Sequence, residues 1–194
     1  MELQRFCIKF FAQPPMMVDV SRFIDVFHDW IRRDALPETL IDVVDYRHVA
    51  RGPGVMLISH ESNLSMDHGD DRFGLLYQRK AAQPGSFTSR FLAATEAALM
   101  ACELLEQEPR LQGLKFDGGE LLFTVNDRRL VQDSGTMRLL HDELRSAARL
   151  FYGTTHIDIE TTTRKPRERI RLSVRAAGST DLNKLLENLR CRPH

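Results

Sequence analysis

The chain has 194 residues, of which 42% are hydrophobic and 28% are charged, so it can bury a core as one large domain or two small ones. Its 27 Lys and Arg residues balance 27 Asp and Glu residues, which argues against a protein whose main work is to bind nucleic acid or acidic membranes. The zero net charge favours self-association into a homo-oligomer. Three widely spaced cysteines, no signal-peptide pattern and no long apolar run predict a cytoplasmic protein without a membrane span.

Apolar runs and alternation predict strands, and apolar residues at spacings of three and four predict helices. In chain order we expect a strand at 6–11, a helix at 20–33, strands at 40–45, 55–59 and 73–78, a helix at 87–107, a strand at 120–125, a helix at 137–152, strands at 156–161 and 170–175, and a helix at 181–189. Gly153 supplies the stop of the third helix, and the polar stretch His60–Arg72 is expected to be a loop.

This order predicts an α+β fold, with a mostly antiparallel sheet and helices packed on one side. We expect residues 1–194 to form a single α+β domain. Two βαββα halves, 1–112 and 113–194, also suggest an internal duplication, with Leu40–Val43 echoing His156–Ile159. The alternative is an accidental repeat of a common order, since residue identity between the halves is otherwise poor.

The stretch from His60 to Asp71 carries two histidines and four carboxylates directly after a predicted strand. Imidazole and carboxylate groups together suit zinc or another transition metal when their geometry converges. The candidate metal ligands are His60, Glu61, Asp67 and His68. Their spacing matches neither a zinc-protease helix nor an EF-hand loop, so the alternative is a solvated acidic loop.

A second group of polar residues follows the strand at 40–45. Asp45 and His48 are close enough in sequence to pair, and a carboxylate can set the tautomer of a histidine for acid–base work. With His60 and Glu61 facing them across a hairpin, these four residues are the candidate catalytic groups. The alternative is a hairpin end with polar side chains.

The most basic stretch of the chain, Arg164–Arg175, contains five arginines and one lysine. Such a cluster attracts phosphates, but no aromatic pattern of an RNA-binding sheet accompanies it, so we favour a solvated hairpin over a nucleic-acid site. No glycine-rich phosphate loop is present, and no cofactor is expected.

Several segments resemble a group of uncharacterised bacterial proteins of about this length. They are Phe27–Ile31, Leu40–Tyr46, His48, Gly52–Glu61, Asn126–Arg128 and Phe151–Gly153. This resemblance implies a bacterial cytosolic protein and carries no activity, cofactor or binding residues.

The leading hypothesis is therefore a non-enzymatic binding or assembly protein that acts through protein–protein contacts or self-association. It rests on balanced charge and on a sequence without a nucleophile elbow, metal motif or nucleotide loop. The alternative is a metal-dependent or small-molecule enzyme that uses the region of His48, His60, Glu61 and His68.

Overall fold

The computed structural model describes residues 2–14, 18–50, 52–69, 72–127, 130, 132–163, 168–178 and 181–190. The elements in these ranges are β1 (Phe6–Ala12), α1 (Arg22–Arg32), β2 (Leu40–Asp45), β3 (Val55–Ser59), β4 (Ser62–Asp67), β5 (Gly74–Arg79), α2 (Phe87–Glu106), the 3-10 helix η2 (Pro109–Leu111), β6 (Phe116–Val125), α3 (Ser134–Tyr152), β7 (Ile157–Thr161), β8 (Arg171–Ala176) and α4 (Leu182–Arg190). Every predicted strand and helix is present.

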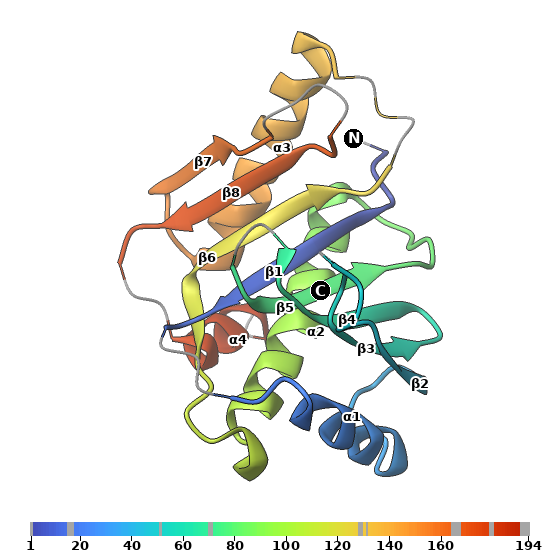
Figure 1. The fold of residues 1–194 in the computed structure, drawn as a ribbon. Helices are drawn as coiled ribbons and strands as arrows, with labels where there is room; N and C mark the ends of the chain where they lie inside the picture. Colours follow the sequence, from blue (N-terminus) through green and yellow to red (C-terminus); the bar gives the residue numbers. More distant parts are fainter. Residues whose placement is uncertain are drawn as a thin grey trace.

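All eight strands form one antiparallel sheet in the order β2-β3-β4-β5-β1-β6-β8-β7. The predicted α+β class, with helices packed on one side of the sheet, is confirmed. In Figure 1, α2 and α3 lie behind the twisted sheet, and α1 lies below β2 and β3. The predicted halves meet at the centre of the sheet, because β1 pairs directly with β6.

The stretch expected to be a loop after His60 contains strand β4, so that prediction was wrong. Its residues alternate between polar and apolar side chains, which is the period of a strand. Leu64 and Met66 point into the hydrophobic core, while Asn63 and Ser65 point to the other face. With β4 and with β5, which corresponds to the predicted strand at 73–78, the first half has the order βαββββα and not βαββα, whereas the second half has the predicted order. An internal duplication stays a hypothesis.

Strand β6 also begins earlier than expected, at Phe116 instead of Glu120. The pair Gly118-Gly119 lies within this strand. A register shift between Phe10 and Ala12 of β1 accommodates this part of β6. Glycine in a strand often marks such an irregularity.

The core fills the space between the sheet and the helices. Helix α2 contacts β1 and β5, α3 contacts β7, α4 contacts β6, and α1 packs against β2 and β3. At its centre, the ring of Phe123 on β6 lies 5.1 Å from Phe6 on β1 and within 6.2 Å of Phe87 and Phe91 on α2. Aromatic side chains from both predicted halves thus share one hydrophobic cluster.

Lys9 lies on the sheet face opposite the helices, because its neighbours Ile8 and Phe10 point into the core. The residue is nevertheless fully buried. Its Nζ donates hydrogen bonds to Asp67 Oδ2 at 2.6 Å and to the carbonyl oxygen of Gly69 at 2.7 Å. The chain after β4 therefore covers this part of the open face.

Arg72, just before β5, also covers part of this open face of the sheet. Its guanidinium carbon lies 3.5 Å from the centre of the Phe11 ring, and its Nη1 donates to Glu120 Oε2 on β6 at 2.8 Å. Burial alone raises the pKa of the Glu120 carboxyl, but hydrogen bonds from Arg72 and Ser173 outweigh it and lower that pKa. Contacts between side chains therefore connect the start of β5 with β1, β6 and β8 on this face of the sheet.

Helix α3 ends as predicted at Gly153, which has φ of 67°. This left-handed conformation costs a residue with a Cβ about 1–2 kcal/mol. We expect Gly153→Ala to lower the free energy of unfolding by about 1 kcal/mol in urea titrations. Gly153→Asn is the matched control, because asparagine tolerates this conformation and should lose less. Equal losses for the two variants would contradict the conformational explanation.

None of the helices in the described ranges is long and apolar enough to cross a membrane.

Candidate functional site

The structure does not bring the four candidate catalytic residues together. Asp45 ends β2 and pairs with Val55 at the start of β3, while His60 follows the end of β3. His48 lies in the loop that leaves β2, so it and His60 lie at opposite ends of the hairpin. Five strand residues separate these ends, which corresponds to about 17 Å.

Asp45 has a different partner from the one expected. Arg47 donates to both of its carboxylate oxygens, at 2.9 and 2.7 Å. These hydrogen bonds lower the pKa of Asp45 to about 2, and the charge of His48 contributes least among the causes. The His48 ring lies 6.5 Å from the ring of Tyr46. The region is an exposed hairpin end with an Asp–Arg pair.

The candidate metal ligands are divided by strand β4. His60 and Glu61 precede it, and Asp67 and His68 stand at its far end, about 20 Å away for a strand of this length. Glu61 pairs with Arg79 at 2.9 Å, and Asp67 is held by Lys9. Over the described ranges, no group of three His, Cys, Asp or Glu side chains is placed to hold a metal ion.

A cleft of about 690 Å³ opens at one end of the four central strands. Because neighbouring strands are antiparallel, the start of β1, the ends of β5 and β6 and the start of β8 meet at this end. The backbone N–H of Asn126 donates to the carbonyl oxygen of Arg5 at 2.9 Å, which fixes two of the segments. The lining residues are Arg5, Gln78, Arg79, Lys80, Asn126, Asp127 and Arg169.

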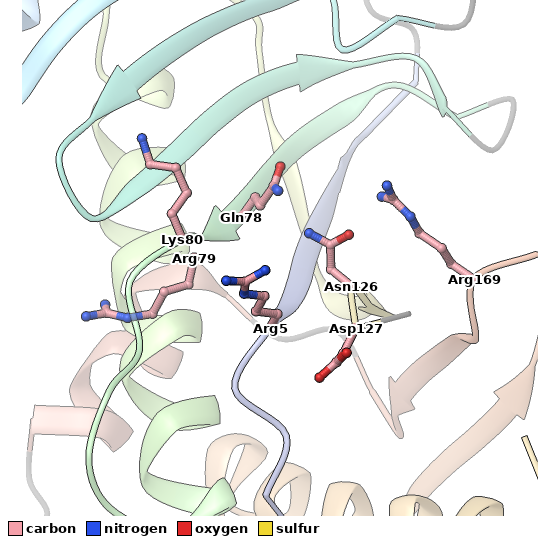
Figure 2. Close-up of a pocket in the computed structure, with 7 residues that line it drawn as sticks. All are labelled: Arg5, Gln78, Arg79, Lys80, Asn126, Asp127 and Arg169. Carbon is pink, nitrogen blue, oxygen red and sulfur yellow. The ribbon is translucent and has the colours of Figure 1, made fainter. Parts of the chain in front are cut away.

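Figure 2 shows how these side chains are arranged. Those of Arg5, Gln78 and Asn126 turn toward a common space, with Arg169 beyond Asn126. The side chain of Asp127 points in the opposite direction from that of Asn126. The lining thus presents guanidinium and amide groups to the cleft, and its one acidic residue is turned aside.

Two of the four basic side chains have partners. Arg79 pairs with Glu61, and Lys80 Nζ donates to the carbonyl oxygen of Ser59 at 2.6 Å. The guanidinium groups of Arg5 and Arg169, by contrast, make no hydrogen bond or ion pair with any residue that the structure describes. Unpaired guanidinium groups retain all five N–H donors for an anion, which they can hold in bidentate geometry.

The side-chain amides of Gln78 and Asn126 are likewise without a partner among the described residues. Each amide offers two N–H donors and one acceptor oxygen. Near the floor of the cleft, Cys7 is paired in register with Gln78. Burial raises the pKa of the Cys7 thiol to about 12, although the nearby charge of Arg169 opposes this. The thiol is therefore protonated at neutral pH and is a poor nucleophile.

Sequence reasoning found one of these residues in a functional context. Arg169 belongs to the basic stretch Arg164–Arg175, of which residues 164–167 lie outside the described ranges. Arg5, Gln78, Lys80 and Asn126 were not recognised as site residues. A signal was present, because each lies within two residues of the end of a predicted strand. Only the order of the strands in the sheet shows that these ends lie together.

Comparison of the chain with protein-family models, with curated proteins and with solved structures gives no match.

Proposed function

We propose that this protein is a non-enzymatic binding protein for a small anion, which it holds in the cleft lined by Arg5 and Arg169. The observation that carries the proposal is the pair of guanidinium groups that face one cavity without a partner in the described chain. Phosphate and carboxylate groups match the planar fork of arginine, and the amides of Gln78 and Asn126 add donors around it.

The size and charge of the cleft favour a small ligand. A volume of about 690 Å³ lies within the range of small-molecule sites, roughly 300–1,000 Å³. A phosphorylated metabolite fits this range. A nucleic-acid polymer would require an extended basic surface, whereas the chain as a whole carries no net charge. The proposal keeps the binding role expected from the sequence and replaces the protein partner with a small anion.

The test is isothermal titration calorimetry of the full chain with inorganic pyrophosphate in a low-salt buffer free of phosphate and sulfate. We expect saturable binding that weakens as salt is added, because ions screen charged contacts. Arg5→Ala and Arg169→Ala should each weaken binding by about tenfold or more, since a hydrogen bond to a charged group contributes about 1.5–3 kcal/mol.

Lys115→Ala is the matched control. It removes one positive charge just before β6, at the end of that strand remote from the cleft. We expect it to bind pyrophosphate as the wild type does. The proposal fails if pyrophosphate does not bind the wild type, or if Arg5→Ala, Arg169→Ala and Lys115→Ala bind it equally well.

A further inference from the structure

A second cavity lies on the helix side of the sheet. It has a volume of about 430 Å³ and is bounded by the strands β2 to β5, helix α2 and the segment before β2. Tyr77 and Arg79 of β5 line it, and Gln78 between them points to the opposite face, as alternation requires. The cavity and the cationic cleft share Arg79, the last residue of β5, and no other lining residue.

Most of its wall is apolar. Leucine side chains come from β2, β3 and β4 and from the segment before β2, and α2 adds small or flexible residues at Ala93, Ala97 and Met100. An apolar wall with a few convergent polar groups is the usual composition of a small-molecule site. The polar groups should then decide what kind of ligand is bound.

The polar end is built around the carboxylate of Glu38. Ser59 and Ser62 donate their hydroxyl protons to its Oε2, and Tyr77 donates to its Oε1 at 3.0 Å. Burial, and next the charge of Glu38, raise the pKa of Tyr77 to about 12, so this phenol stays a donor. A carboxylate offers about four acceptor sites, and the three hydroxyls leave one on Oε1 for a ligand.

Two more carboxylates line the same cavity. Glu61 is paired with Arg79, whereas Glu96 on α2 has no partner among the residues that the structure describes. Three carboxylates against one guanidinium give the lining a net charge of about minus two when all are ionised. We infer that this cavity binds a small organic cation with an apolar body, its ammonium group between Glu38 and Glu96.

The proposal is tested by calorimetry of the full chain with three probes that share a six-carbon chain: hexylammonium chloride, sodium hexanoate and 1-hexanol. Apolar burial is similar for the three, so differences report the charged group. We expect hexylammonium to bind at least about tenfold more tightly than either other probe. Hexanoate or hexanol binding as tightly as hexylammonium would overturn the proposal.

Variants locate the binding within the cavity. Glu96→Gln removes a partly exposed charge without changing the shape of the side chain, and it should weaken hexylammonium binding severalfold. Glu103→Gln, two turns along the same helix and outside the cavity lining, is the matched control and should bind as the wild type does. Ala97→Leu fills the cavity and should abolish binding. Unchanged binding in both Glu96→Gln and Ala97→Leu would place the cation elsewhere and overturn the inference.

Discussion

Replacing Phe123 with alanine is expected to lower the free energy of unfolding by about 3–5 kcal/mol. The ring is fully buried and contacts Phe6, Phe87 and Phe91, so its removal leaves a cavity that no single neighbour can fill. The lost stability has two parts: the free energy gained by burying the ring away from water, and the packing contacts that the neighbouring rings no longer make. Few other single changes in the described chain should cost as much.

The measurement is chemical denaturation of the wild type and of Phe123→Ala, followed by circular dichroism. Leu139→Ala on α3 is the control, because this leucine is 49% exposed and should lose little. Since Phe123 joins strands and a helix from both predicted halves, we also expect one cooperative transition. A variant that loses less than about 1 kcal/mol, or two separate transitions, would contradict this description of the core.

Local patterns were sufficient to predict most of the fold. The apolar run at Val55–Ser59 and the helical spacing of Phe23, Phe27 and Trp30 each identify one element, because burial on one face imposes a period on the sequence. Strand β4 was missed because Ser62, Asn63 and Ser65 are polar residues, and we gave their type more weight than their alternation. Ser62 and Ser65 are both buried in the sheet, and the Ser62 hydroxyl donates to the carboxylate of Glu38.

The candidate site was much harder to predict. Arg5, Gln78, Asn126 and Arg169 belong to four segments that are distant in sequence, and they meet because β1 lies between β5 and β6. Strand order depends on the packing of the whole sheet, and no local pattern encodes it. Histidines and carboxylates were predicted as site residues because their side chains are chemically versatile. The cleft is formed instead by arginine and amide groups, whose role depends on which residues lie beside them in the fold.

The burial of Lys9, which affects the stability of the fold, was equally hard to predict from local sequence. Its position in an alternating strand predicts an exposed side chain, yet it is fully buried and bonded to Asp67. Removing one member of a buried ion pair leaves the other charge without compensation, which costs about 3–5 kcal/mol. We therefore expect Asp67→Asn to lower the free energy of unfolding by about 3 kcal/mol, because it replaces the charged acceptor of the buried Lys9 ammonium with a neutral amide. Lys9→Met should lower the free energy of unfolding by a similar amount, because the Asp67 carboxylate then lies against an apolar side chain.

A double-mutant cycle separates the ion pair from the general cost of changing this face. The variant Lys9→Met with Asp67→Asn should lose less than the sum of the two single losses, by about 2 kcal/mol, because each single change already removes the ion pair between these two side chains. The exposed pair Asp45 and Arg47 gives the control cycle, in which water screens both groups and the coupling should be undetectable in urea titrations. Strict additivity at Lys9 and Asp67 would mean that the two side chains act independently, and that the loop after β4 is held over the sheet by other contacts.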